Sequence, residues 1–277
     1  MQEPIKLIRK YYKAIVITLF LAVIYFPTIQ WMVDRWTAVD SYFGHGFLVP
    51  LVSLYMLRRK KERLKKMAKQ PNNLGLFFMA LGLLIHIMSS FLRVYFTSAY
   101  SFLLVLIGII LYFFGVRILK ECSFPIGFLI FMIPIPEVAI VNITFKMKLF
   151  AAHWATVILN KMGIAAIRDG SLIHMRKAVL MVEDQCSGLR SLISLLALGS
   201  LVAYLSGLSR VKKIIVVIAS APIALLANIA RIVMMCIMSQ LYGVQFIEGP
   251  MHTASGLFVF VVAFIGLAIL VKSLEKN

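Results

Sequence analysis

Long runs of apolar residues recur along this chain and dominate its pattern. A helix needs about 20 mostly apolar residues to cross a hydrocarbon core of about 30 Å. The pattern therefore predicts eight membrane-spanning helices, near residues 14–33, 43–57, 74–92, 98–116, 121–135, 187–206, 213–240 and 255–272. The second and fifth runs are short, and Pro50, Pro125 and Pro134 are expected to kink or end them.

The longest stretch outside these runs, residues 137–185, mixes polar and apolar residues. Its first half, residues 138–162, combines lysine, histidine and asparagine with leucine, phenylalanine and tryptophan. That composition is typical of a helix lying at a membrane interface. The second half, residues 166–182, places Asp169-Gly170 between apolar and β-branched residues, which predicts a short hairpin.

The composition is that of an integral membrane protein. Hydrophobic residues make up 61% of the chain and charged residues 14%, against about 45–50% and 25% in soluble domains. We find no internal repeat, low-complexity segment or linker. The sequence thus predicts one polytopic domain over residues 1–277, an all-α membrane protein of about eight transmembrane helices. Residues 137–185 would form an amphipathic helix and hairpin that cap its extracytoplasmic face.

The strong positive charge lies mainly in short loops between the apolar runs. The 29 lysines and arginines exceed the 11 acidic residues by a net charge of +18, and eight of the basic residues fall in Arg58–Lys69. This placement is a topology signal, not a groove for nucleic acid. Because cytoplasmic loops carry the excess of Lys and Arg, we predict that both termini are cytoplasmic. The outward-facing segments would then be residues 34–44, 93–97, 137–185 and 243–254.

Cysteine spacing gives no sign of a disulfide framework or a zinc site, and no HExxH pattern is present, so we expect no metal and no cofactor. Cys186 stands among polar residues where the sixth run begins, and Asp184 or Ser187 can cap that helix. A helix start favours the reactive thiolate. The alternative is a small buried side chain, which is the role expected for Cys122 and Cys236.

His252 precedes the eighth run, at the same outer level as Cys186. Imidazole titrates near neutral pH and commonly shuttles protons for a thiol nucleophile. His45, in a Gly-His-Gly sequence on the outer side, is the main rival, and a merely solvated histidine is the plain alternative. His86 is expected to pack between helices and His174 to face solvent.

Arg231 lies within an apolar run, where a guanidinium costs at least about 2.5–3.5 kcal/mol and usually marks a site. It lies about 27 Å along its helix from Lys213, near the outer surface, where snorkelling is the alternative role. Asn228, three residues earlier on the same helical face, can orient the guanidinium. Arg190, four residues after Cys186, can favour the thiolate or anchor its helix in the headgroups.

These residues make a complete set for acyl transfer. A Cys186 thiolate can attack a carbonyl, Arg231 can stabilise the oxyanion, and His252 can act as acid and base. The sixth, seventh and eighth runs supply one residue each, so we predict that the three converge at the outer face of the membrane.

Several motifs together resemble the exosortase/archaeosortase family of membrane cysteine transpeptidases. They are Cys186-Ser187-Gly188-Leu189-Arg190-Ser191, Asn228-x-x-Arg231, His252 and the early Gly44–Leu51, which is similar to the bacterial branch. The resemblance covers residues from about 40 to 270. It implies catalytic roles for Cys186, Arg231 and His252, with Asn228, Arg190, His45 and Asp184 as supporting or substrate-binding residues.

The resemblance also implies a substrate. Family substrates are exported proteins whose C-terminal sorting tail has a short motif (Pro-Glu-Pro in bacteria), a transmembrane helix and a basic cluster. Cleavage would form a thioester on Cys186, and transfer to a surface or lipid-linked acceptor would follow. Basic residues of the cap can attract the motif's glutamate, with contact to anionic lipid headgroups as the alternative: Lys146, Lys148, Arg168, Arg176 and Lys177.

Two other function classes stay open on the sequence: a transporter with Arg231 as its anion site, and a non-catalytic factor for exopolysaccharide assembly. The expected location is a bacterial inner membrane, with an archaeal membrane as the alternative. The expected partners are the sorting tail and membrane lipid, and no nucleic acid.

Overall fold

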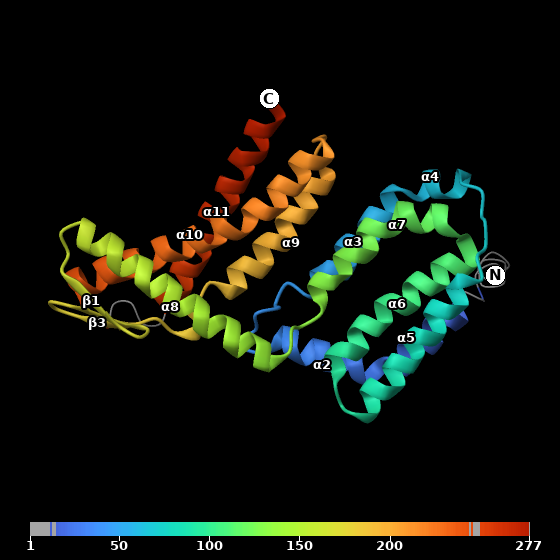
Figure 1. Ribbon diagram of the computed structural model, residues 1–277, viewed down its shortest axis with the longest axis horizontal. Helices are drawn as coiled ribbons and strands as arrows, with labels where there is room; N and C mark the ends of the chain where they lie inside the picture. The colour runs from blue at the N-terminus through green and yellow to red at the C-terminus, as the bar shows by residue number, and fades with distance from the viewer. Residues whose placement is uncertain (1–11, 13–14, 244, 246–249, 277) are drawn as a thin grey trace, which may run out of the picture. The chain divides into compact units, whose positions relative to one another are not determined.

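The computed structural model describes residues 12, 15–243, 245 and 250–276, and their side chains except those of 250–253. Within this range one small sheet accompanies an otherwise helical fold (Figure 1). The chain forms two compact units, one comprising Met1–Val39 with Gly44–Pro134 and the other Asp40–Phe43 with Ile135–Asn277. The single domain over residues 1–277 stays a prediction.

The first unit is built around a tight pair of helices, α5 and α6. Its elements are α2 (Phe26–Thr37), α3 (Leu48–Arg59), α4 (Lys61–Lys66), α5 (Leu74–Phe91), α6 (Tyr95–Phe114), α7 (Val116–Phe128) and the 3₁₀ helix η1 (Leu129–Met132). Glycines let the pair approach closely, since a Cβ on Gly82 would lie 2.7 Å from the Val105 side chain and one on Gly108 equally near Met79.

Buried hydroxyls tie the chain around α2 to this helix pair. The Thr28 and Ser98 hydroxyl oxygens lie 2.6 Å apart, and the Tyr25 hydroxyl lies 2.9 Å from that of Ser101. His86 Nδ1 lies 2.8 Å from the Ser98 hydroxyl, and the His86 ring packs 4.2 Å from the Tyr25 ring, measured between centroids. The expectation that His86 packs between helices is therefore confirmed.

Five helices are long and apolar enough to cross a membrane: Leu74–Phe91, Tyr95–Phe114, Asp184–Leu205, Arg210–Tyr242 and Ala254–Lys276. Two further helix pairs, each bent at a short break, qualify if each pair counts as one span, which raises the number to as many as seven: Ile15–Ile24 with Phe26–Thr37, and Val116–Met132 with Glu137–Lys161. An all-α membrane protein is thus confirmed, but eight spans are not found among the described residues. The expected span at 43–57 is α3, whose 12 residues extend only about 18 Å.

The second unit is organised around α10, which packs against α8, α9 and α11. Its elements are α8 (Glu137–Lys161), β1 (Ala166–Asp169), β2 (Leu172–Met175), β3 (Val179–Met181), the 3₁₀ helix η2 (Asp184–Cys186), α9 (Leu189–Leu205), α10 (Arg210–Tyr242) and α11 (Pro250–Lys276). Figure 1 shows α9, α10 and α11 side by side, with the strands near one end of α8.

The predicted helix and hairpin of residues 138–182 are both present. The helix is α8, and β1 pairs antiparallel with β2 so that Asp169 lies opposite Leu172 across the turn at Gly170. A third strand, β3, extends the hairpin to a sheet in the order β1-β2-β3. Ile173 of β2 is fully buried in a cluster with residues of α8 and α10. Placement of this cap on the extracytoplasmic face stays a prediction.

Candidate active site

The chain turns from η2 into α9 through a glycine that no other residue replaces without strain. Gly188 has φ +87, in the left-handed region, and a Cβ there would lie 2.9 Å from Cγ of Asn228. Asn228, on α10, donates a hydrogen bond from Nδ2 to the carbonyl oxygen of Cys186 at 2.7 Å. The Cys-Ser-Gly sequence therefore holds Cys186 against the helix that carries Arg231.

Of the two residues that the sequence offers as caps of the sixth span, Asp184 and Ser187, the structure favours Ser187. Gly188 occupies the N-cap position of α9, and the N–H of Leu189 is instead accepted by the Ser187 hydroxyl at 3.3 Å. Asp184 is exposed and pairs with Lys148 of α8 at 2.7 Å. Lys148 is one of the lysines expected to attract substrate, and this ion pair already engages it. The Asp184 carboxylate therefore ties η2 to α8.

Arg231 is buried inside the unit rather than extended to its surface, since only 8% of the residue is exposed. Its Nε donates a hydrogen bond to the Ser255 hydroxyl of α11 at 3.0 Å. Gly256 lies beneath the guanidinium, where a Cβ would come within 3.6 Å of Nη2. Ser255 thus holds the guanidinium near the start of α11. Nothing in the sequence indicated this role for Ser255.

A polar cavity of about 360 Å³ opens beside these groups. Its lining residues are Gln185, Gly188, Arg190, Ser191, Ser194, Asn228, Arg231, Gly256, Leu257, Val259 and Phe260. Two guanidinium groups, two amides and two hydroxyls thus line the cavity together with an apolar wall from α11. Polar groups within a membrane-spanning bundle usually mark a functional site.

The Cys186 side chain is buried, with 4% of the residue exposed, in a cluster that includes Ile229, Ile232 and Val233 of α10. Its neighbours Gln185 and Gly188 line the cavity on either side. The thiol also lies near enough to Arg231 to interact with its charge. The structure therefore brings together Cys186, Asn228 and Arg231, with Arg190 on the cavity wall.

The chain matches the family model described as transmembrane exosortase over residues 31–269, most of its length. The chain belongs to the transmembrane exosortase family. No curated protein and no solved structure matches it. Family membership and the apolar helices make it a multi-pass membrane protein and support a transpeptidase-like role in general.

His252 of this exosortase lies in α11, but its side chain falls outside the described part of the structure. It precedes Ser255 and Gly256, the two residues that contact Arg231, by three and four positions in the helix. Residues at these spacings share one face of an α-helix. That the imidazole faces Arg231 and Cys186 stays a prediction.

His45, the rival histidine, belongs to the first unit, where its side chain hydrogen-bonds the backbone of Phe131. Burial lowers the pKa of His45, and the hydrogen bond offsets part of this effect. A Cβ on the adjacent Gly46 would overlap the Trp36 indole, so the Gly-His-Gly sequence has a packing role. A role for His45 in the reaction stays a prediction.

The Gly188 contact makes a testable prediction with a matched control. Gly188→Ala should lower stability by the left-handed penalty, about 1–2 kcal/mol, plus the cost of overlap with Asn228, about 1–3 kcal/mol. Gly163→Ala should show only the first loss, because Gly163 has φ +82 and no atom within 4 Å of its added Cβ. Thermal unfolding in detergent measures both, and equal losses would contradict the close approach of Gly188 and Asn228.

Proposed function

We propose that this exosortase is a membrane cysteine protease/transpeptidase that cleaves C-terminal sorting tails at the extracytoplasmic face and transfers the released protein to a surface acceptor. The observation that carries the proposal is the hydrogen bond from Asn228 to the Cys186 carbonyl. It fixes the cysteine segment to the helix that also supplies the buried Arg231, beside a polar cavity. A transporter or an assembly factor has no need for that arrangement around a thiol.

The proposed reaction has two acyl-transfer steps. The Cys186 thiolate attacks the carbonyl carbon of the scissile peptide bond, and the carbonyl electron pair moves onto oxygen, where Arg231 stabilises it. The tetrahedral intermediate collapses to a thioester as the amine leaves with a proton from the His252 imidazolium. An acceptor nucleophile then gives its proton to His252, attacks the thioester and releases the thiolate.

The surroundings of Cys186 assign Arg231 a second role in this proposal. The thiol lies among apolar side chains, where an anionic sulfur is disfavoured unless a cation is close. Arg231 supplies that cation, and its hydrogen bond to Ser255 keeps it in place. Gln185 and Gly188, on either side of Cys186 in the chain, line the cavity, so a small shift of this segment would bring the sulfur to a bound peptide.

The cavity also suits the motif of the sorting tail. Arg190 is exposed on its wall, where its guanidinium can pair with the carboxylate of a motif glutamate. None of the five basic cap residues lines this cavity, and Lys148 among them is already engaged by Asp184, so Arg190 is the better candidate for this contact. The apolar wall from α11 would face the start of the tail's transmembrane helix.

A thioester on Cys186 is the direct test of this proposal. Purified protein mixed with a sorting-tail peptide and stopped in acid should carry the peptide's N-terminal part on Cys186, visible by mass spectrometry as a hydroxylamine-labile adduct. Cys122 and Cys236 should stay unmodified in the same sample, because neither lines the cavity that Gln185 and Gly188 line on either side of Cys186. Tail cleavage without any adduct, under conditions that withhold the acceptor, would exclude the covalent route.

A further inference from the structure

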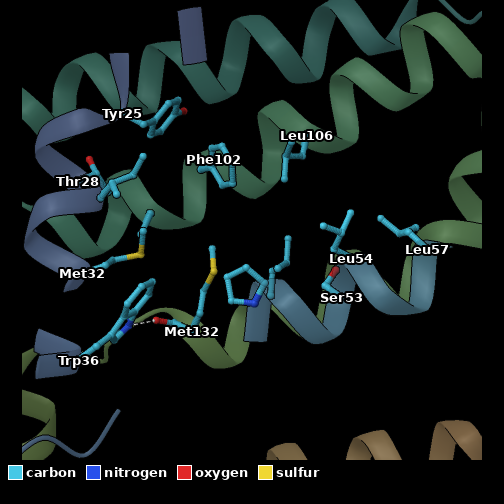
Figure 2. A pocket seen from close by; sticks show the side chains of 14 residues that line it. Tyr25, Thr28, Met32, Trp36, Ser53, Leu54, Leu57, Phe102, Leu106 and Met132 are labelled. Atoms are coloured by element: carbon cyan, nitrogen blue, oxygen red, sulfur yellow. Dashed lines mark hydrogen bonds between the residues drawn. The ribbon is translucent and has the colours of Figure 1, made fainter. Parts of the chain in front are cut away.

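A second cavity lies in the first unit, and the side chains that line it have no part in the proposed reaction. It measures about 360 Å³ and lies among α2, α3, α6 and η1 (Figure 2). Apolar side chains from all four elements line it: Met32, Leu54, Phe102, Leu106 and Met132 among them. The lining thus resembles the inside of a protein core, but the space is empty of side chains.

The polar residues on this wall have their hydrogen-bonding groups engaged by the protein. The Trp36 indole N–H donates to the Met132 carbonyl at 2.8 Å, as Figure 2 shows, and the Ser53 hydroxyl donates to the Pro125 carbonyl at 2.8 Å. The hydroxyls of Thr28 and Tyr25 pair with serines of α6. Water needs two to four polar partners in a cavity, so this space suits an apolar occupant.

Another cavity, of about 490 Å³, adjoins this one along α3, where Leu54 and Leu57 line both. Here the floor is apolar, with Leu64, Phe114 and Ile118, but the rim is basic. Four cationic side chains of α3, α4 and the following segment stand on it: Arg58, Lys61, Lys65 and Lys69. We call the two adjoining cavities the groove; its lining is apolar in both, and its charged residues stand at the rim of the larger cavity.

Acidic residues neutralise only part of this charge. Glu62 pairs with the rim residue Lys65 at 2.8 Å, while Glu121 pairs with Lys60 and Arg63, which do not line the groove, at 2.9 and 3.2 Å. Among the described residues, no carboxylate lies within salt-bridge distance of the other three rim cations, which are Arg58, Lys61 and Lys69. The Lys69 ammonium stands 5.2 Å from the centre of the Phe114 ring, over the groove floor.

We propose that this groove binds an anionic phospholipid, with an acyl chain in the apolar section and the acidic headgroup on Arg58, Lys61 and Lys69. Both parts of such a lipid match the groove: the acyl chain contacts apolar side chains, and the phosphate contacts the rim cations. A sorting tail fits less well, because its basic cluster would meet like charges at the rim. A soluble phosphate would leave the apolar section without a role.

Native mass spectrometry of the full-length protein in mild detergent tests this proposal. We expect phosphatidylglycerol to stay bound in preference to phosphatidylcholine when both are offered. The triple variant Arg58→Gln/Lys61→Gln/Lys69→Gln should lose roughly a hundredfold in affinity for phosphatidylglycerol, at roughly fivefold for each charge. Leu106→Trp, which fills the apolar cavity, should also weaken binding while leaving every charge in place.

A charge-matched control separates a built site from general attraction to a basic surface. The variant Arg59→Gln/Lys66→Gln/Arg117→Gln removes the same charge from exposed residues outside the groove and should keep the preference. Equal loss in the two triple variants would overturn the proposal in favour of diffuse attraction. Displacement by glycerol 3-phosphate would show a plain phosphate site, and unchanged binding in Leu106→Trp would remove the acyl chain from the groove.

Discussion

Cys186→Ala should abolish cleavage of a sorting tail, with a fall in rate of at least about a thousandfold. The reason is that the proposed thioester has no other sulfur to form on at the candidate site. Cys122 belongs to the first unit, and the neighbours of Cys236 do not line the cavity beside Arg231, whereas Gln185 and Gly188 on either side of Cys186 do. Appearance of the shortened substrate, followed by immunoblotting in reconstituted vesicles, measures the effect. The cost in stability should be small, since a single sulfur atom is removed.

Cys122→Ala and Cys236→Ala are the matched controls for this experiment. Each removes one buried sulfur of similar exposure, 4% and 0% of the residue respectively, and should leave cleavage within about threefold of the unmodified protein. If Cys186→Ala cleaves tails at the rate of these controls, the cysteine mechanism fails. A function as a transporter or an assembly factor would then be the better interpretation.

Arg231→Lys should reduce cleavage by about a hundredfold to a thousandfold while the protein still inserts and folds. Lysine keeps the positive charge but loses the planar fork of N–H groups, so the bond to Ser255 and the contact with a developing oxyanion are not both restored. Single-turnover measurement of thioester formation isolates the step that should slow. Binding of the tail peptide should change little, because Arg190 is the proposed contact for the motif.

Arg210→Lys makes the matched control, since Arg210 is exposed at the first residue of the same helix, α10. It should leave thioester formation unchanged. Size-exclusion and thermal unfolding of both variants separate a chemical effect from a folding defect. An Arg231→Lys protein that is stable and forms the thioester at the normal rate would remove Arg231 from the reaction.

The sequence by itself determined the membrane class and most helices. Long apolar runs can be satisfied only in a bilayer, and their composition needs no tertiary information to be recognised. The hairpin at Asp169-Gly170 followed in the same way from local turn chemistry. The residues of the candidate site stood out because a guanidinium in an apolar run is costly and a thiol among polar groups is unusual.

Tertiary structure decided what local pattern does not contain. The short proline-bearing runs pack as a 12-residue helix and as bent helices instead of separate spans, because neighbouring helices determine how a half-length run is buried. Asn228 holds the Cys186 carbonyl, and Ser255 holds Arg231, across residues that lie 42 and 24 positions apart in the chain. Such contacts depend on how the helices of the second unit pack together. The spacing of residues within one helix does not predict which other helices it contacts.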